Sequence, residues 1–550
     1  MIRFLLAALV AAWAAHSVRA EVSFWPESSG EMILPDRVKG SEERIVRSGV
    51  RGEFVTAQLA LRVDAIPQAD LSLEWTALKG PGGTELAKEH LAFYRAAEIV
   101  VDHGTQVDEA KDPHRVRKLG AFPDALVPLK LADGTNVANA VRPEPQKTIA
   151  FWLDLYIPAD TKPGAYSGRV ELREGDKALV AVPIVLTVLD AAIPADSTIP
   201  SLYNLRAHPH VKANIDAYAR EMQRHRIQAT SYHYLALAGR ADFGLEFLDR
   251  FNPDGKGWVS VYVPDAVKPT PDREKELADQ LKRIAAHLKE KKLFEKSFVY
   301  LKDEPDESAI QGALETAKIV LREVTEWKGK LLCTLNRDGS VLEEVLTHYS
   351  RALKVYGPWY AQNKLPRGRE EWDRARAEGK ELWFYVSNAQ GWPYFTFDIQ
   401  TVKTAWEPRV MGWAWWYEKA YGHLYWDLMY VNGWKSHPKF PPGDGQLIYP
   451  GDLSMPGAPE FSSIKDLKMP VVSRRLKLLR EGLEEWELLK LAEAKAGRAK
   501  VQAIVDKVYT AMGRRTWAPE AYDPKKPMWS YEEAAWDRAR EEIIALIQAK

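Results

Sequence analysis

Ser297-Phe298-Val299-Tyr300-Leu301 is a short apolar run that ends directly in Lys302-Asp303-Glu304-Pro305. The run has the length and the aromatic and β-branched composition of a buried strand, and Pro305 prevents simple continuation of the strand ladder. Amphipathic helical patterns stand on both sides of it, at 274–291 and 310–327. Strands that alternate with helices form βα units, so this segment predicts a parallel sheet covered by helices.

The same alternation extends over residues 197–490. We expect strands at 201–205, 227–235, 297–301, 330–335, 353–356, 382–386 and 422–426, and further helices at 211–225 and 399–417. Roughly eight such repeats are typical of a (β/α)8 TIM-like barrel, although the sequence does not indicate which run forms the third strand. The alternative is an open doubly wound sheet, which would favour a glycine-rich phosphate loop, and no G-x-G-x-x-G or Walker pattern is present.

Residues 22–196 show a different pattern. Short apolar runs follow one another without helices between them, at 54–63, 71–78, 93–101, 149–157, 166–172 and 179–189. This pattern favours an N-terminal antiparallel β-sandwich that ends at the linker Ile193–Ser197. From about residue 475 the chain is helical and charged, and we expect residues 491–550 to form a helical extension on the outside of the barrel.

The first 20 residues resemble a cleavable export signal. Arg3 precedes an apolar run over residues 4–15, and the small residues Val18 and Ala20 suit a signal peptidase. A membrane anchor is the alternative, but the run is short for a permanent span. We therefore expect export to the periplasm or the medium, with no membrane attachment after cleavage.

Composition excludes several classes of protein. The chain has 76 basic and 76 acidic residues, so it lacks the positive charge of a dedicated nucleic-acid binder. Its one cysteine excludes a disulfide framework and a multi-cysteine zinc cluster. His208 and His210 are two imidazoles without nearby carboxylates in the sequence and do not indicate a metal site. The sequence does not indicate an oligomeric state.

Asp303 and Glu304 are the candidate catalytic residues. Catalytic groups of a barrel lie at the carboxyl ends of its strands, and two adjacent carboxylates repel, so we expect the pKa of one to rise, further so with partial burial. A proton donor beside an anion is the pairing that glycoside cleavage requires. The competing interpretation is a helix cap, because Asp-x-x-Glu is also a capping pattern and Asp-Glu recurs at 108–109 and 306–307.

Aromatic residues provide a second indication. Ten of the 20 Trp lie between Trp359 and Trp434, and aromatic faces stack on the apolar faces of sugar rings. Most of these indoles are expected to be structural. The candidate substrate-binding residues are Tyr385, Trp426, Trp359, Asn336 and His233.

Several motifs together resemble glycoside hydrolase family 123 and its relatives. They are Lys302–Pro305, Gly422–Trp426, Tyr449–Gly451 and Ser473–Gly482 followed by Glu487, with Trp152–Pro158 and Pro163–Gly168 in the N-terminal half. Each motif is weak alone, and their order and spacing are more specific. Glu485 and Trp486 depart from the family pattern, where Asp and Tyr are more frequent.

The resemblance implies a β-sandwich followed by a (β/α)8 barrel with β-N-acetylgalactosaminidase or related β-N-acetylhexosaminidase activity. It also implies a retaining mechanism assisted by the 2-acetamido group of the substrate, in which Glu304 is the acid/base and Asp303 orients the acetamido group. The resemblance implies neither a metal nor an organic cofactor. The preference between galacto and gluco sugars rests on the resemblance alone, and the natural glycan and exo or endo action stay open.

Two other hypotheses remain open at this point. The first is a retaining glycosidase of another specificity with a separate protein nucleophile about 5 Å from Glu304. The second is a non-catalytic carbohydrate-binding protein that uses the aromatic cleft.

Overall fold

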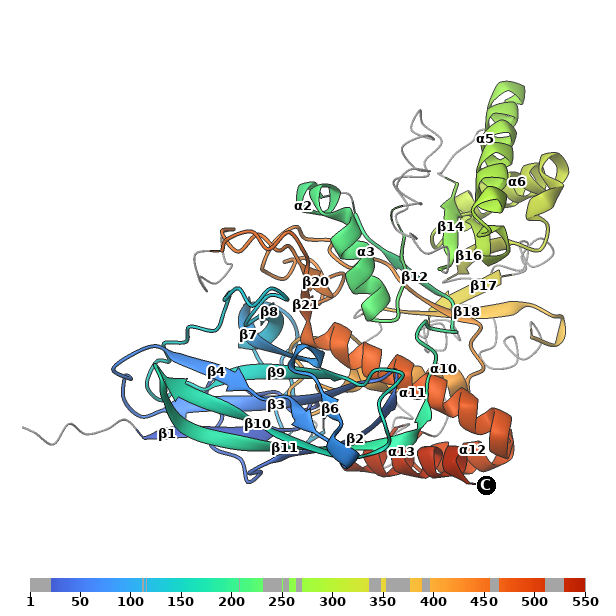
Figure 1. Ribbon diagram of the computed structural model, residues 1–550. Coiled ribbons are helices and arrows are strands. Elements are labelled where there is room, and N and C mark those ends of the chain that lie inside the picture. Colours follow the sequence, from blue (N-terminus) through green and yellow to red (C-terminus); the bar gives the residue numbers. More distant parts are fainter. Residues whose placement is uncertain are drawn as a thin grey trace, which may run out of the picture.

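A computed structural model describes residues 21–549 except 111, 112, 115, 207, 231–249, 251–256, 264–269, 336–347, 353–375, 388–395, 456–463 and 510–528. Its strands form three sheets. Two of them lie together in the N-terminal half, and the third lies in the half that carries the long helices α5 and α6 (Figure 1).

The first sheet has seven strands in the order β1-β3-β9-β7-β8-β21-β20. Its pairs are antiparallel, and Leu59 faces Phe151 across β3 and β9. Its strands are β1 (Val22–Glu27), β3 (Phe54–Val63), β7 (Leu91–Val101), β8 (Gly120–Pro128), β9 (Ile149–Tyr156), β20 (Ile448–Tyr449) and β21 (Val471–Ser473).

The second sheet packs on the first. Its order is β2-β11-β10-β5-β6, with β4 also paired to β10. The strands are β2 (Ile45–Arg51), β4 (Leu71–Trp75), β5 (Leu78–Lys79), β6 (Glu85–Leu86), β10 (Gly164–Glu174) and β11 (Lys177–Ala192). Leu59 and Phe93 of the first sheet share a core with Leu172 and Leu186 of the second, as in a β-sandwich. The sandwich is not purely antiparallel, because β2 runs parallel to β11.

The third sheet has eight strands, all parallel, in the order β13-β12-β19-β18-β17-β16-β15-β14. They are β12 (Ser201–Asn204), β13 (Ala229–Thr230), β14 (Val259–Tyr262), β15 (Ser297–Tyr300), β16 (Leu331–Leu335), β17 (His348–Ala352), β18 (Glu381–Val386) and β19 (Gly422–Tyr425). This is the strand order of an eight-stranded barrel opened between β13 and β14, two strands that no backbone pairing joins within the described residues.

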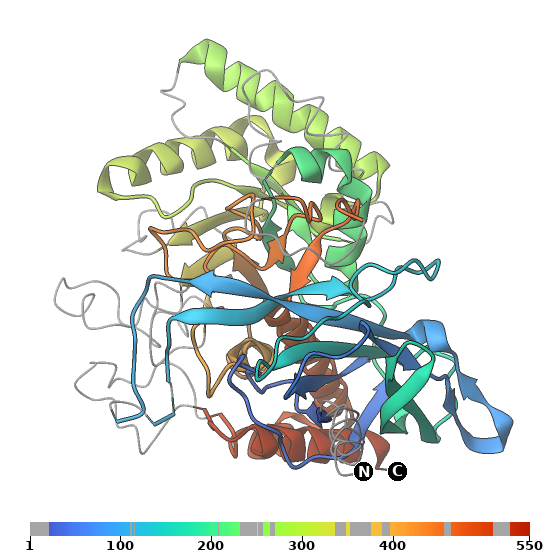
Figure 2. The same ribbon diagram turned by 90° about the vertical axis from the view of Figure 1, so that its left-hand side faces the viewer.

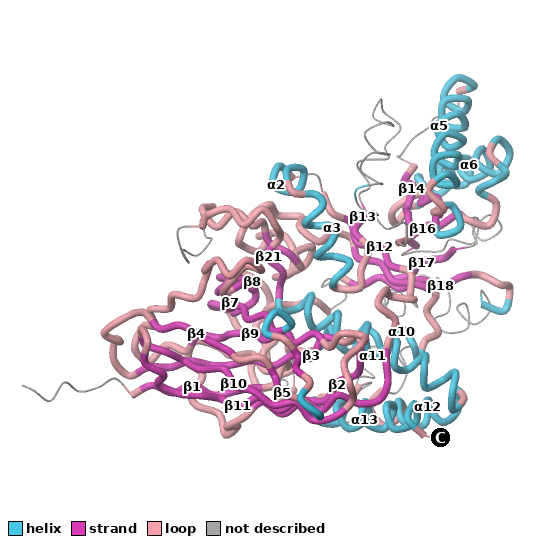
Figure 3. The backbone as a smooth tube through the Cα atoms, viewed as in Figure 1, coloured by secondary structure: helices cyan, strands magenta, loops and turns pink. Residues whose placement is uncertain are grey.

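Helices follow these strands in the chain (Figure 3). They are α2 (Pro209–Ala213), α3 (Ile215–Arg224), α5 (Pro271–Glu290), α6 (Glu307–Glu323) and α10 (Glu407–Tyr417). In α5, Leu277, Leu281, Ile284 and Leu288 are buried, as the amphipathic pattern predicts. The sequence did not indicate β14 or β17, and the strand that it predicted at 353–356 lies outside the described residues.

The helix α11 (Arg474–Ala496) lies between the two halves of the chain. It begins directly after β21, which pairs with β8 of the sandwich through Val472 and Leu126. Figure 2 shows the orange strand β21 beside the blue strands of the sandwich. Two strands from the C-terminal half, β20 and β21, therefore extend an N-terminal sheet.

Buried ion pairs fasten α11 to the sandwich. The Asp154 carboxylate on β9 accepts hydrogen bonds from Lys477 Nζ at 2.5 Å and from Arg480 at 2.8 Å, and all three side chains are fully buried. Although burial raises the pKa of Asp154, Arg480 and Lys477 hold that pKa well below its usual range. A third buried cation of α11, Arg475 in the first turn, binds Asp124 on β8 at 2.8 Å.

The C-terminal helices are α12 (Arg498–Val505) and α13 (Glu533–Gln548). The tail does not simply cover the barrel, because α13 packs against α11 and the sandwich strand β11. The Glu533 carboxylate accepts a hydrogen bond from Ser28 Oγ at 2.8 Å, and Arg540 pairs with Glu53. Among the described residues, no helix combines the length and the apolar character needed to cross a membrane.

Candidate active site

The strand β15 presents its side chains alternately to two faces of the parallel sheet. Phe298 and Tyr300 belong to a small core inside the sheet, with Leu202, Leu332, Trp383, Tyr385 and Leu424 from four other strands. Val299 and Leu301 belong to the larger core that the covering helices share. The chain leaves the sheet after Leu301, so Asp303 and Glu304 lie at its carboxyl edge, where catalytic groups of such sheets are found.

The helix cap that follows is formed by another residue. Asp306 is the N-cap of α6, and its Oδ1 accepts hydrogen bonds from the backbone N–H groups of Ser308 and Ala309 at 3.0 and 2.9 Å. This is the capping role that the sequence pattern offered as an alternative. Asp303 and Glu304 do not take part in it, so their carboxylates remain available for chemistry.

Asp303 is anchored through one oxygen. The Tyr300 hydroxyl on β15 donates to Asp303 Oδ1 at 2.9 Å, and the Thr334 hydroxyl on β16 lies 2.8 Å from the same oxygen. Thr334 is fully buried, as is Tyr300. Every hydrogen bond that the structure shows at this carboxylate ends on Oδ1. None that it shows within the described residues ends on Oδ2.

Glu304 is held in an unusual backbone conformation. Its φ is +41°, in the left-handed region that non-glycine residues rarely adopt. Its N–H donates to Thr334 Oγ1 at 3.0 Å, and its carboxylate accepts a hydrogen bond from the Tyr385 phenol on β18. Backbone strain of about 1–3 kcal/mol persists only where surrounding contacts fix it, and such strain concentrates at active sites.

The two candidate catalytic residues are exposed, and the hydroxyls of Tyr300 and Thr334 beneath them are buried. The arrangement is a buried polar network that presents two carboxylates at the edge of the sheet. Such a network fixes orientation without excluding a substrate from the carboxylates.

The predicted substrate-binding residues fall into two groups. Tyr385 contacts Glu304, and Trp426 directly follows β19 at the same edge of the sheet. Trp426 Nε1 donates to Asp444 Oδ1 at 2.9 Å, and its ring packs on those of Tyr430 and Phe440. Trp359, Asn336 and His233 lie outside the described residues.

A polar cluster that the sequence analysis missed lies beside Trp426. Asp427 is fully buried and accepts hydrogen bonds from Arg206 and, at 3.5 Å, from Asn204. Burial raises the pKa of Asp427 to about 7, and the Arg206 guanidinium opposes this rise. The guanidinium also lies 4.6 Å from the centre of the Tyr430 ring. Asn204 is the last residue of β12, and Asp427 follows the end of β19. Polar residues at strand ends are a signal that could have identified both.

The two histidines noted in the sequence both contact other protein groups. His208 Nε2 lies 2.8 Å from the Met429 carbonyl, and His210 lies within hydrogen-bond distance of Tyr218 and Asp466. Among the described residues, no group of three or more histidine, cysteine or acidic side chains has the geometry to hold a metal ion.

A parallel sheet with adjacent carboxylates at its carboxyl edge, next to aromatic side chains, is the arrangement of a glycosidase. Sequence comparison agrees with this class. Residues 213–492 match the catalytic domain of glycoside hydrolase family 123, and residues 33–174 match the N-terminal domain of the same family. The catalytic match alone covers just over half of the 550 residues. The chain belongs to glycoside hydrolase family 123.

Solved structures support the fold. A family 123 glycoside hydrolase from Clostridium perfringens, studied for glycolipid glycan hydrolysis, is 14% identical and has a TM-score of 0.68, over 95% of this chain and 99% of that chain. A family 39 glycoside hydrolase from Bacteroides cellulosilyticus is 8% identical with a TM-score of 0.33, over 80% and 82% of the two chains. A score this low does not establish a shared fold. No curated protein matches the chain in sequence.

Proposed function

We propose that this glycoside hydrolase removes β-linked N-acetylgalactosamine, or a related N-acetylhexosamine, by a retaining mechanism in which the substrate's acetamido group is the nucleophile. Glu304 is the acid/base and Asp303 orients the acetamido group. The observation that carries the proposal is the one-sided anchoring of Asp303. Two hydroxyls lie against Oδ1, so Oδ2 can accept the N–H of a 2-acetamido group.

The proposed reaction has two steps. In the first, the acetamido oxygen attacks C1 and the C1–O glycosidic bond breaks while Glu304 gives its proton to the leaving oxygen. Asp303, as an anion, stabilises the positive charge that develops on the oxazolinium nitrogen. In the second step, the Glu304 carboxylate takes a proton from water, and the water oxygen attacks C1 and opens the ring. Inversion twice at C1 returns the β configuration.

We also propose that the parallel sheet closes into a (β/α)8 barrel. Gln228, next to β13, accepts a hydrogen bond from the Trp258 N–H, next to β14, at 2.7 Å. The ring of Trp258 also packs on that of Tyr421 at 5.8 Å, across the amino end of the sheet. These contacts bring the two end strands together and support closure. In a closed barrel, Asp303, Glu304 and Trp426 would surround one mouth.

Two further parts of the proposal concern the substrate class and the location of the protein. The Clostridium perfringens relative is associated with glycolipid glycans, and we propose a glycan of the cell surface or its surroundings as the substrate class here. The sequence of residues 1–20 supports export.

Chromogenic substrates test the proposal. We expect turnover of a β-N-acetylgalactosaminide or β-N-acetylglucosaminide and none of a plain β-galactoside, because the latter lacks the nucleophile. A GalNAc-derived thiazoline should inhibit competitively. Equal rates on the plain galactoside would instead indicate a separate protein nucleophile.

Two substitutions assign the roles. Glu304→Gln should lower kcat by about 10²–10⁴-fold with sugar binding retained, and Asp303→Asn should lower kcat by about 10²-fold or more. Glu295→Gln is the matched control, because Glu295 lies exposed before the amino end of β15. Unchanged rates in Glu304→Gln would exclude the catalytic assignment, and a silent Asp303→Asn would exclude substrate assistance even if hydrolysis persists.

A further inference from the structure

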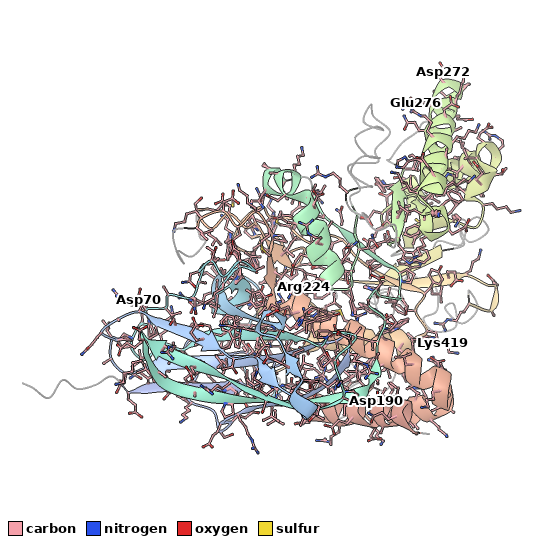
Figure 4. All side chains as sticks on the ribbon, viewed as in Figure 1. Asp70, Asp190, Arg224, Asp272, Glu276 and Lys419 are labelled. Atoms are coloured by element: carbon pink, nitrogen blue, oxygen red, sulfur yellow. The ribbon has the colours of Figure 1, made fainter. Side chains whose placement is uncertain are left out.

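The connection between β7 and β8 joins the β-sandwich to the half of the chain that carries the parallel sheet. Figure 4 labels Asp70 on the sandwich and Asp272 at the tip of α5, on opposite sides of the molecule. In the described part of this connection, the Lys118 N–H donates to the Gln400 carbonyl at 3.3 Å, and the Lys118 carbonyl accepts from Gln400 Nε2 at 2.9 Å. One loop of the sandwich is thus hydrogen-bonded to the other half of the chain.

The same connection contacts the loop 440–446, which follows β19 in the chain. Gly104 has a φ of +107°, a conformation that favours glycine, and a Cβ on this residue would lie 2.9 Å from Pro442. Next to it, His103 Nε2 donates to the Phe440 carbonyl at 3.2 Å. The side chain of His103 is 23% exposed. The sandwich therefore holds the first residue of this loop through one hydrogen bond.

The loop 440–446 also packs around Trp426. The ring of Phe440 lies 5.4 Å from that of Trp426 in an edge-on arrangement, and Asp444 Oδ1 accepts from Trp426 Nε1 at 2.9 Å. Gly445 has a φ of +67°, and a Cβ on it would overlap the indole. Trp426 is nevertheless partly exposed, so part of its ring remains accessible at the carboxyl edge of the sheet.

A second contact ties the loop to the sandwich. Arg475 donates to the Gly443 carbonyl at 2.8 Å, and the same guanidinium binds Asp124 on β8. Arg475 is fully buried, so its replacement would disturb the fold itself. His103 is partly exposed and makes one hydrogen bond to the loop. It is therefore the contact that can be removed with the fold intact.

We propose that His103 is a positioning residue for the substrate: it holds Phe440, and through the loop 440–446 it fixes the indole of Trp426 on which a sugar ring stacks. The β-sandwich then contributes to substrate binding through a contact that lies outside the catalytic pair. The inference rests on the proposed function in one respect, namely that Trp426 binds the substrate. A binding side chain is effective only when the residues around it hold its orientation.

Steady-state kinetics of His103→Leu in the full chain tests the proposal, with the chromogenic glycoside that the wild type cleaves fastest. We expect KM to rise about two- to tenfold, the equivalent of one lost hydrogen bond. We expect kcat to stay near the wild-type value, because stacking on Trp426 binds ground state and transition state alike. A role in folding alone would lower kcat through a smaller active fraction at unchanged KM, and that result would overturn the proposal.

Two further variants sharpen the comparison. His103→Gln places an amide N–H near the position of Nε2 and should restore most of the wild-type KM. His90→Leu is the matched control, because His90 directly precedes β7 at the opposite end of that strand, and its KM should be unchanged. A KM of His103→Gln as high as that of His103→Leu would show that the hydrogen bond is not the cause.

A double-mutant cycle with Trp426→Leu connects the two residues. In the Trp426→Leu background, His103→Leu should have no further effect on KM, because both substitutions act through the same indole. Independent, additive effects on KM would overturn the proposal.

The outcome is separable from the proposed specificity. If the wild type prefers a plain β-galactoside, the proposed function fails, and the same KM comparison on that substrate still tests His103. If the wild type cleaves none of the glycosides, crystal structures of the wild type and of His103→Leu decide. We expect the rings of Phe440 and Trp426 to be displaced in the variant, and superimposable rings would overturn the proposal.

Discussion

The phenol of Tyr385 donates a hydrogen bond to the carboxylate of Glu304, although β16 and β17 separate their two strands in the sheet. Tyr385 therefore reaches across the edge of the sheet to a residue whose backbone is itself strained. The hydrogen bond fixes the position of the carboxylate that we propose as the acid/base.

Replacing Tyr385 should affect kcat more than KM. In Tyr385→Phe the ring remains and the donor to Glu304 is lost, so we expect kcat to fall by about 10- to 100-fold. Initial rates on a β-N-acetylhexosaminide give both constants. Tyr421→Phe is the control, because Tyr421 lies before the amino end of β19. Wild-type kcat in Tyr385→Phe would show that this hydrogen bond does not position Glu304 for the reaction.

Thr334 should act on both catalytic residues at once. Thr334→Val removes the acceptor of the Glu304 N–H and a hydroxyl beside Asp303 while keeping the shape of the side chain. We expect a loss of about 1–3 kcal/mol in the free energy of unfolding and a fall in kcat. Thr334→Ser keeps the hydroxyl and should restore most of the rate. If the serine variant were as slow as the valine variant, packing and not the hydroxyl would be the cause.

The buried ion cluster on α11 should dominate stability. Asp154→Asn leaves the buried Lys477 and Arg480 without their anion, and we expect a loss of about 3–5 kcal/mol in the free energy of unfolding. Urea or thermal denaturation measures it. The control is Asp190→Asn, since Asp190 pairs with Arg51 at the surface and keeps 75% of its side chain exposed. A surface pair contributes about 0–1 kcal/mol, so similar losses in both variants would refute the special role of Asp154.

Stability should depend on pH through Glu481. Burial raises the pKa of Glu481 to about 7, with Arg409 opposing the rise. The folded state therefore keeps its proton while the unfolded chain loses it above about pH 4.5, and the stability of the wild type falls as pH rises from there to about 7.

The glutamine in Glu481→Gln cannot ionise. We therefore expect the melting temperature of this variant, relative to that of the wild type, to increase from about pH 4.5 to about pH 7 and to stay constant at higher pH. The corresponding difference in the free energy of unfolding is at most about 3 kcal/mol. Glu541→Gln, at an exposed position of α13, provides the control. A difference that stays constant from pH 4.5 to 8 would contradict the shifted titration.

Local patterns were sufficient for part of this fold. The apolar run at 54–63 has the same bounds as β3, although nearly all of its side chains are buried, and the apolar run before Lys302 contains β15. Short strands could not be identified in the same way. β14 has four residues, too few for a distinctive pattern, and its place in the sheet is fixed by its pairing with β15.

Long-range pairing was also beyond the sequence. The charges of α11 look like a solvated face, yet Arg475, Lys477 and Arg480 are buried because carboxylates more than 300 residues earlier in the chain meet them. Asp303 and Glu304 could be proposed from one local signal, two carboxylates directly after a strand. Thr334 and Tyr385 were harder to assign to Glu304, because only the strand order of the sheet brings β16 and β18 near β15.

The pairing of β21 with β8 has a consequence for how the chain is made. During synthesis the hydrogen-bonding edge of β8 stays open until residue 473 has left the ribosome, and an open edge invites pairing with other chains. A fragment that stops at the linker near residue 196 would keep that edge and leave Asp124 and Asp154 without their cations. Truncated forms of the N-terminal half should therefore aggregate, and the two halves are better regarded as a single cooperative folding unit than as separable modules.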